Sequence, residues 1–329
     1  MLKTNAKNQI LAIISPIALL CGMTLAAPLA AQTYPTKPVR IIVPFAAGGG
    51  ADLTARVMAQ LLTERVKQSF IVENRVGASG IIATEFVANA APDGYTLLLG
   101  SQTTQAVVPA MYKVSYNTAK DFVGVAEVAR SPLFLVVHPS LPVKNVGEFI
   151  RLAKTRPGQL SFGAASGGTP HMAGELFRLS AGIELLLVPY KGEGPALSDA
   201  IGGQISMVFA NLPVGLPHAK SGRLRGLAVT SARRVPTAQE YPTVAESGLT
   251  GYEAETWNGF FAPAATPRDI VARLQSEVTA AVNNADAREK MASQGMFLGS
   301  STQEQFAEFV KKEMARWTKV VKDAGIKPQ

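Results

Sequence analysis

The sequence predicts an α/β protein of two domains, each built on a mostly parallel sheet with helices on both faces. Strand-like and helix-like apolar patterns alternate along most of the chain, which is typical of parallel strands joined by crossover helices. The chain of 329 residues is too long for one typical hydrophobic core and suits two. Two glycine-rich turns, each joining an apolar strand to a helix, lie more than a hundred residues apart, so we expect one in each domain.

The first 31 residues have the pattern of a secretory signal peptide, with two lysines, a largely apolar stretch and then small residues. We expect cleavage after Ala31, or alternatively after Ala27, and export of the mature chain. A lipoprotein anchored through Cys21 is the other possibility. It is disfavoured because Leu20 is bulky where a lipoprotein signal needs a small residue.

Without residues 1–31 the chain has no cysteine, which excludes disulfides and thiolate metal sites. The remaining histidines are His138, His171 and His218, and their spacing matches no zinc motif. We therefore expect no metal and no cofactor.

The net charge is +8, and it becomes +6 when Lys3 and Lys7 leave with the signal peptide, since residues 1–31 hold no acid. The basic residues are scattered rather than grouped in blocks interleaved with aromatics, so nucleic acid is not an expected partner. The modest basic excess serves either solubility or attraction of anionic ligands.

Residues 39–231 predict two sets of strands and helices. In the first set the helix after the opening strand has an apolar stripe of Leu53, Val57, Leu61 and Leu62. The predicted strands are 39–45, 70–74, 95–100, 133–139, 159–165, 184–190, 205–211 and 224–231. The predicted helices between them include 81–90, 145–154, a helix opened by Thr169 as cap with Pro170 in its first turn, and 194–203.

The C-terminal stretch is mainly helical. One helix opens at Thr266–Asp269, and another follows a predicted capping box at Ser301–Glu304 and ends at Gly325. The second carries a stripe of Phe306, Phe309, Val310, Met314, Trp317 and Val321. We expect this stripe to pack on its own domain rather than bind a partner, because the opposite face is a run of lysines.

No flexible linker rich in glycine and serine separates the two regions, so strands that cross between the domains are the expected connection. The candidates are 124–131 and 250–261. With these crossings the first domain is discontinuous. The expected division is residues 1–31 as signal peptide, 32–130 with 256–329 as the first domain, and 131–255 as the second.

The two glycine-rich turns are candidate anion sites. Side chains of Gly, Ala and Ser leave backbone N–H groups uncovered, and a helix start adds unpaired donors and the positive end of its dipole. In the first turn Asp52 either caps its helix or accepts a hydrogen bond from a ligand. In the second, Ser166 and Thr169 either donate to a carboxylate or satisfy their own turn. His171 faces either the ligand or, as we favour, solvent.

Three further residues lie at ends of predicted strands. Ser101 follows the strand 95–100, at the edge where open α/β sheets place ligands. Asn211 ends a strand and has an amide to offer. Trp257 falls in a crossing segment, where we favour packing at the hinge over contact with a ligand.

Enzyme motifs are absent from the sequence. The Gly-x-Ser-x-Gly elbow, the Walker phosphate loop and the dinucleotide Gly-x-Gly-x-x-Gly spacing all fail to match. We therefore expect a binding protein rather than an enzyme. An exported hydrolase or transferase on the same architecture, and a ligand-sensing subunit for a membrane kinase, are the alternatives.

Several segments resemble the Bug receptors, the periplasmic substrate-binding proteins of tripartite tricarboxylate transporters. The matching segments are YPTKPVRIIVPFAAGGGADLTAR, VENRVGASG, APDGYTLLLG, VPYKGEGPALSDAIGGQ, PTVAESG and WNGFFAP. The resemblance implies a type II periplasmic-binding-protein fold, in which two crossing strands join two α/β domains around a ligand cleft. It also implies a monomeric periplasmic receptor that passes a small organic acid to inner-membrane permease subunits.

The resemblance further implies that the two turns act as a pincer on a ligand carboxylate. By matching positions, the pincer residues are Phe45, Ala47, Gly48 and Asp52 on one side, and Ser166, Gly167, Gly168, Thr169 and His171 on the other. Val76 stands in place of a proline common in the family. Ala210 stands where many members have an acid before Asn-Leu-Pro, which favours a carboxylate ligand without an obligatory amine.

Overall fold

The computed structural model describes residues 34–299 and 301–327. The predicted signal peptide and Cys21 lie outside these residues. Residues 34–36 fall in a separate unit, and the chain from Lys37 onward forms one compact unit. Everything below concerns this second unit.

The strands follow the predicted alternation with helices. Within the described residues they are β1 (Val39–Val43), β2 (Phe70–Asn74), β3 (Thr96–Ser101), β4 (Phe122–Val137), β5 (Ser161–Ala165), β6 (Leu186–Tyr190), β7 (Met207–Asn211), β8 (Arg225–Val229), β9 (Glu255–Pro263) and β10 (Phe297–Leu298).

The helices lie between the strands and at the C-terminal end. The α-helices are α1 (Gly50–Val66), α2 (Ile81–Ala88), α3 (Val108–Met111), α4 (Thr118–Asp121), α5 (Val146–Thr155), α6 (Thr169–Ala181), α7 (Glu193–Ile201), α8 (Leu212–Lys220), α9 (Arg268–Val282), α10 (Ala285–Ser293) and α11 (Gln303–Asp323). Short turns of other helix types are η1 (Ala78–Gly80), the π-helical η2 (Thr103–Val107) and η3 (Pro236–Ala238).

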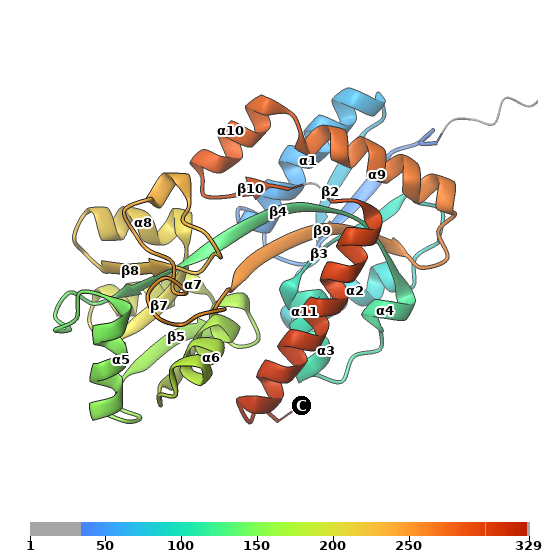
Figure 1. The fold of residues 1–329 in the computed structure, drawn as a ribbon. Helices are drawn as coiled ribbons and strands as arrows, with labels where there is room; N and C mark the ends of the chain where they lie inside the picture. The colour runs from blue at the N-terminus through green and yellow to red at the C-terminus, as the bar shows by residue number, and fades with distance from the viewer. Residues whose placement is uncertain (1–33, 300, 328–329) are drawn as a thin grey trace, which may run out of the picture. The chain divides into compact units, whose positions relative to one another are not determined.

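Two α/β domains are joined by two long strands, β4 and β9, as the sequence predicts (Figure 1). The strands lie in the order β2-β1-β3-β9-β4-β7-β5-β6, and β8 and β10 each pair with β4. Residues 122–132 of β4 pair with β9, whereas its last five residues, 133–137, pair with β7 and β8. The strand predicted at 133–139 is therefore only the second half of a strand that belongs to both sheets.

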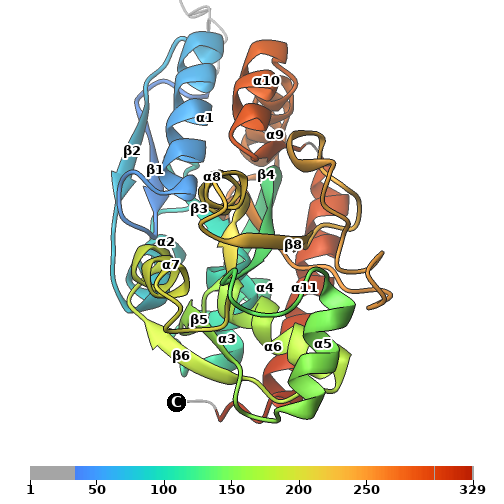
Figure 2. The same cartoon turned by 90° about the vertical axis from the view of Figure 1, so that its left-hand side faces the viewer.

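The two outer groups of strands are parallel, which agrees with the predicted crossover connections. Strands β1, β2 and β3 are parallel neighbours in one sheet, and β5, β6 and β7 in the other. On the first sheet, α1 packs on β1 and β2 beside α9 (Figure 2). The carboxyl ends of these parallel strands therefore lie at one edge of each sheet. The glycine-rich turns follow β1 and β5 at these edges.

The predicted apolar stripe of α1 is only partly correct. Leu62 is buried, but Leu53, Val57 and Leu61 are half-buried. The buried face of this helix consists instead of Asp52, Thr54, Ala55, Met58, Ala59 and Leu62. Small side chains on this face let the helix approach its neighbours closely, and the larger aliphatic residues cover its flanks.

Helix α11 packs on the cores of both domains. Phe306 and Val310 belong to an apolar cluster with Ile42 and Leu98 of the first sheet. Further along the helix, Trp317 lies in a cluster with residues of β5, β7 and α6, such as Phe162 and Phe177. The aromatic stripe packs inside the protein, as predicted, but on both domains rather than on its own domain alone, and the lysines of the other face are exposed.

The capping box of α11 lies one residue later than predicted. Thr302 is the N-cap, and its hydroxyl accepts a hydrogen bond from Gln305 N at 3.2 Å, while Gln305 Oε1 accepts from Thr302 N at 3.0 Å. Both the Ser301–Glu304 and the Thr302–Gln305 pairs fit the sequence motif, so the motif alone did not fix the register. At the other end, Gly325 has φ +70° directly after the cap residue Ala324.

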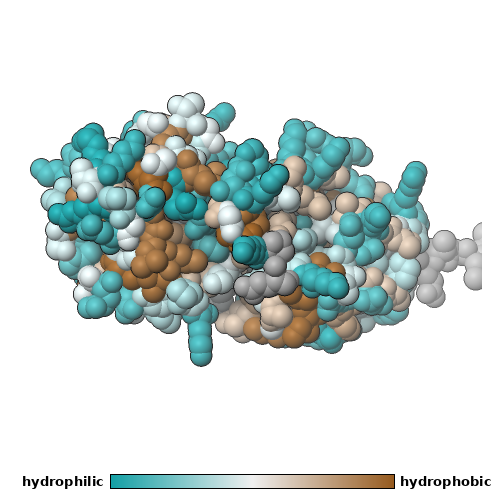
Figure 3. Space-filling view, turned by 90° about the horizontal axis from the view of Figure 1, so that it is seen from below, coloured by the Kyte–Doolittle hydropathy of each residue, from teal (hydrophilic) through white to brown (hydrophobic). Residues whose placement is uncertain are grey.

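The surface carries no large continuous apolar belt on the face shown in Figure 3, where apolar patches are separated by hydrophilic residues. The exposed large hydrophobic residues among those described are Ile71, Val76, Ile82, Leu186 and Val214. No helix of the described residues is both long and apolar enough to span a bilayer.

We predict that Thr302→Ala lowers the free energy of unfolding by about 1 kcal/mol, because it removes the side-chain cap of α11. Ser301→Ala is the matched control and should change the stability by less than about 0.5 kcal/mol. Urea denaturation of both variants measures the difference. A larger loss in Ser301→Ala than in Thr302→Ala would mean that the helix begins one residue earlier.

Candidate ligand-binding cleft

The first glycine-rich turn is fixed by hydrogen bonds to Asp52, a residue of the helix that follows it. Gly48 has φ +84°, and its N–H donates to Asp52 Oδ2 at 3.0 Å. Asn74 Nδ2 donates to Asp52 Oδ1 and to Phe45 O, both at 3.0 Å. These bonds fix the path of the turn between β1 and α1.

Asp52 is not the helix cap, which corrects one of the two readings from the sequence. The N-cap is Gly49, which has no side chain to cap the helix, and Asp52 is the third helical residue. Its carboxylate is buried and accepts from Arg56 Nε at 2.9 Å. Hydrogen bonding from Arg56, helped by Gly48 and Asn74, lowers the pKa of Asp52 to about 2 despite burial.

The second turn has the same construction with a different side chain. Gly167 has φ +75°, and its N–H donates to His171 Nδ1 at 3.0 Å. Gly168 is the N-cap of α6 without a side-chain cap, so Thr169 is the first helical residue and not the predicted cap. Each turn thus pairs a left-handed glycine with the side chain four residues later.

His171 does not face solvent, contrary to the alternative that the sequence favours. The residue is 4% exposed, and its ring stacks on Phe162. Because Nδ1 accepts a hydrogen bond, the proton of the neutral ring is on Nε2. Burial lowers the pKa of His171 to about 4, so the ring is neutral near pH 7 although Nε2 lies 3.9 Å from Glu175 Oε1.

A cavity of about 660 Å³ lies between the two turns and above the crossing strands. Its lining comes from the first turn and α1, from β3 and η2, from the crossing strands, from the starts of α6, α7 and α8, and from the segment before β10. The lining residues are Phe45, Gly48, Gly49, Gly50, Ala51, Leu53, Thr54, Ser101, Thr103, Ala129, Arg130, Ser131, Thr169, Pro170, Glu193, Gly194, Asn211, Pro213, Val214, Thr256, Asn258, Gln294 and Met296.

The structure brings five of the predicted site residues to this cavity. They are Phe45, Gly48, Ser101, Thr169 and Asn211. Asp52 and His171 lie behind their turns, where they hold the glycine N–H groups. The remaining four do not line the cavity: Ala47 and Ser166 are exposed, and Gly167 and Gly168 precede Thr169 in the second turn.

The floor of the cavity was not predicted. It consists of alternate residues of the crossing strands, with Ala129 opposite Asn258 and Ser131 opposite Thr256. Side chains alternate between the faces of a strand, so Arg130, which pairs with Trp257, directs its side chain to the other face. The alternation of the two crossing segments is the sequence signal that could have identified Thr256 and Asn258.

Glu193 is a further residue of the cavity wall that the sequence analysis missed. It begins α7 directly after Gly192, in a third turn between a strand and a helix. Asn211 N donates to its Oε1 at 2.6 Å, and Asn211 Nδ2 donates to its Oε2 at 2.7 Å. Burial raises the pKa of Glu193, although the two bonds from Asn211 oppose this effect. The motif YKGEGPA contained the signal, as a turn at the end of a strand.

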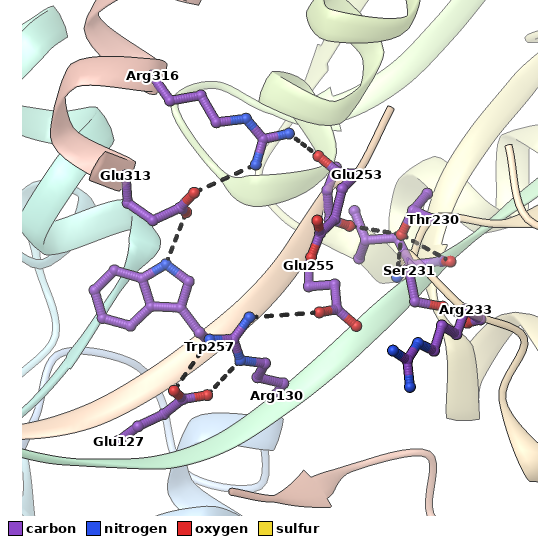
Figure 4. Close-up of polar contacts among 12 residues, drawn as sticks. Glu127, Arg130, Thr230, Ser231, Arg233, Glu253, Glu255, Trp257, Glu313 and Arg316 are labelled. Carbon is purple, nitrogen blue, oxygen red and sulfur yellow. Dashed lines mark hydrogen bonds and ion pairs between the residues drawn. The ribbon is translucent and has the colours of Figure 1, made fainter. Parts of the chain in front are cut away.

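Ionic groups gather on the opposite face of the crossing strands, under α11 (Figure 4). Arg130 Nη2 donates to Glu127 Oε2 at 3.0 Å, and its Nη1 lies 3.9 Å from Glu255 Oε2. Trp257 Nε1 and Trp317 Nε1 donate to Glu313 Oε2 at 2.9 and 2.8 Å. Trp257, which is 1% exposed, therefore packs behind the crossing strands and not in the cavity.

The charge balance of this cluster affects Glu255 most. The Arg130 guanidinium favours ionisation of Glu255 and so opposes the effect of burial, whereas the negative charges of Glu253, Glu127 and Glu313 disfavour ionisation. Burial is the largest effect, and together these causes raise the pKa of Glu255 to about 7. Among the described residues no group of three or more His, Cys, Asp or Glu is placed to hold a metal ion.

Ionisation of Glu255 should lower the stability of the protein as the pH rises, and we predict that Glu255→Gln abolishes this pH dependence. The folded-state pKa lies above the ordinary value, so between about pH 4.5 and 7 the unfolded chain releases the proton first and unfolding becomes easier. At pH 8 the variant should be more stable than wild type by about 1–3 kcal/mol. Denaturant titrations at pH 4.5 and 8 test this, with the exposed Glu240→Gln as control. An equal pH dependence in wild type and Glu255→Gln would contradict it.

The opposite pH dependence is expected from His171. Its folded-state pKa lies below 6.5, so the unfolded chain takes up the proton first, and stability is lost as the pH falls from about 6.5 to about 4. We predict that this loss, about 3 kcal/mol in full, is missing in His171→Phe, which keeps the ring on Phe162. His138→Gln, at a half-exposed histidine, is the control, and it should still lose stability as the pH falls. Melting curves across this pH range distinguish the two.

Comparison with known proteins gives the family. Residues 54–326 match the family described as tripartite tricarboxylate transporter family receptor. Protein BugT of Bordetella pertussis is 37% identical over 323 residues, which cover 97% of this chain and 98% of that protein.

Three solved structures cover nearly the whole fold. A protein of R. palustris solved with adipate is 39% identical with a TM-score of 0.80, covering 90% of this chain and 100% of that one. Periplasmic binding protein BugD is 32% identical with a TM-score of 0.77 and the same coverage. MatC from Rhodopseudomonas palustris, with bound malate, is 30% identical with a TM-score of 0.76, covering 88% and 100%. The chain belongs to the Bug family of periplasmic solute-binding receptors, the receptors of tripartite tricarboxylate transporters.

Proposed function

We propose that this protein captures a small organic carboxylate between the starts of α1 and α6 and delivers it to a tripartite tricarboxylate-type transporter. The observation that carries the proposal is the shared construction of the two turns. In each, the helix start has no side-chain cap, so the N–H groups and the positive end of the helix dipole remain available to an anion.

The composition of the cavity supports a small anionic guest. Gly48, Gly49 and Gly50 bring bare backbone to its wall on one side, and Thr169 and Ser101 add hydroxyl donors. Its volume of about 660 Å³ is ordinary for a small-molecule site. Two similar proteins were solved with adipate and with malate, which are both small carboxylates.

The proposed role is binding without catalysis, in the periplasm after removal of residues 1–31. Residues 32–130 with 256–329 and residues 131–255 would be the two domains, and β4 and β9 the connection about which they close. Closure would exclude water and strengthen the backbone hydrogen bonds to the ligand. The partners are the inner-membrane permease subunits, and the receptor acts as a monomer.

A thermal-shift panel of four- to six-carbon carboxylic acids tests the proposal. At one hundred times its Kd, a ligand that binds only the folded state should add about 2.7 kcal/mol to the stability. Gly48→Val should abolish this effect, because a branched side chain at φ +84° displaces the turn and enters the cavity. Gly182→Val is the matched control, since Gly182 has φ +59° at the end of α6 and does not line the cavity.

Binding that survives in Gly48→Val while both variants lose similar stability would contradict the role of the turns. Uptake of the identified acid by cells with and without the gene then tests delivery to the transporter. Unchanged uptake in the deletion strain would favour a sensing role.

A further inference from the structure

The cavity proposed to hold an anion has a carboxyl group in its wall. Of the described residues that line it, only Arg130 and Glu193 are ionisable. The Arg130 side chain lies on the far face of β4, where it binds Glu127 and covers the Phe309 ring. Among the described residues the guanidinium forms ion pairs with Glu127 and Glu255 and none with Glu193, so the carboxyl group of Glu193 is the acidic group that a ligand meets in the lining.

The Glu193 carboxyl group is held in a fixed position. One oxygen accepts from the backbone and the other from the side chain of Asn211, at 2.6 and 2.7 Å. A carboxylate oxygen accepts more than one hydrogen bond, so each oxygen keeps capacity for a donor from the cavity. Ala210, the residue before Asn211, is buried and offers no acid, so Glu193 supplies the acidic group of this wall from a different element.

Glu193 and the two proposed anion sites make opposite demands on a ligand. The starts of α1 and α6 favour a negative group, whereas the start of α7 presents a negative group of its own. A second carboxylate placed against Glu193 would put two like charges in a site with little water, which costs free energy unless one is neutralised. A hydroxyl or ammonium at the same place would donate a hydrogen bond to a charged acceptor.

We propose that Glu193 is a specificity-determining residue, which makes the cleft select carboxylates whose far end carries a hydrogen-bond donor and disfavour dicarboxylates. This inference rests on the proposed function, since it assumes that one carboxylate occupies the turns. Adipate, with which a similar protein was solved, is therefore a ligand that this chain should disfavour.

Four six-carbon acids that differ only at the far end provide the test: hexanoate, 6-hydroxyhexanoate, 6-aminohexanoate and adipate. Isothermal titration calorimetry of the mature chain at pH 7.5 should rank the hydroxyl and ammonium compounds above hexanoate and adipate last. In Glu193→Gln the ratio of the Kd of adipate to that of 6-aminohexanoate should fall by about tenfold or more, because the charged partner is lost.

Two further variants separate charge from structure. Glu193→Lys should reverse the ranking and favour adipate, which loss of packing alone would not do. Asp199→Asn is the matched control, because Asp199 lies on the same helix, accepts from Tyr190 Oη and does not line the cavity. It should leave all four Kd values unchanged.

The outcomes distinguish the inference from the function on which it rests. Binding of one or more acids with a ranking that Glu193→Gln and Glu193→Lys leave unchanged would overturn the inference and keep the carboxylate receptor. Tightest binding of adipate by wild type would also overturn it. Failure of all four acids and of their four-carbon homologues to bind would overturn the carboxylate assignment itself.

Discussion

The hydrogen bond from a left-handed glycine N–H to the side chain four residues later is the constraint on which the cleft depends. In the first turn Gly48 donates to Asp52, and in the second Gly167 donates to His171. In each turn the side chain that accepts from the glycine N–H belongs to the helix itself and lies on the side away from the cavity. This leaves the first N–H groups of α1 and α6 uncovered, which is the property that an anion site needs.

The crossing strands keep the uncharged surface that lines the cavity apart from a cluster of charged side chains. Their cleft face carries small and uncharged side chains, Ala129, Ser131, Thr256 and Asn258. Their other face carries Arg130, Trp257 and the carboxylates under α11. Because side chains alternate along a strand, one stretch of sequence provides both a neutral floor for the ligand and a charged cluster beside the connection between the domains.

The sequence allowed most of the fold to be predicted, because the alternation of strands and helices is a local property. Strands β1, β2, β5 and β7 lie close to their predicted ranges. The crossing segment 124–131 lies within β4, whereas the segment 250–261 overlaps β9 only from residue 255 onward. The helix starts were misplaced by one residue at Thr169 and Ser301. Both errors arose where two neighbouring residues satisfied the same capping preference, and only the hydrogen bonds of the folded chain distinguish them.

The site was less predictable, because its parts meet only through the order of the strands. Gly48 and Thr169 were identifiable from their turns, but Thr256, Asn258 and Glu193 enter the cavity through pairing across the sheets. The register of β4 against β9 also shifts twice, between Gly124 and Ala126 and between Glu127 and Ala129. Such shifts move side chains from one face to the other, so counting alternate residues along β4 would have misassigned part of the floor.

The pairing of acids with arginines shows why Glu193 stands apart from the other acids around the cleft. Asp52 pairs with Arg56, Glu127 with Arg130, Glu175 with Arg178 and Glu313 with Arg316, each three or four residues later. Each of these carboxylates is buried or nearly so, and its charge is balanced by a cation on its own helix or strand. Glu193 receives only the neutral donors of Asn211 among its described hydrogen bonds. A partly buried carboxyl group without a counter-charge is costly for folding. Because Glu193 lies in the cavity wall, a ligand can supply the hydrogen-bond donor or positive charge that the chain does not.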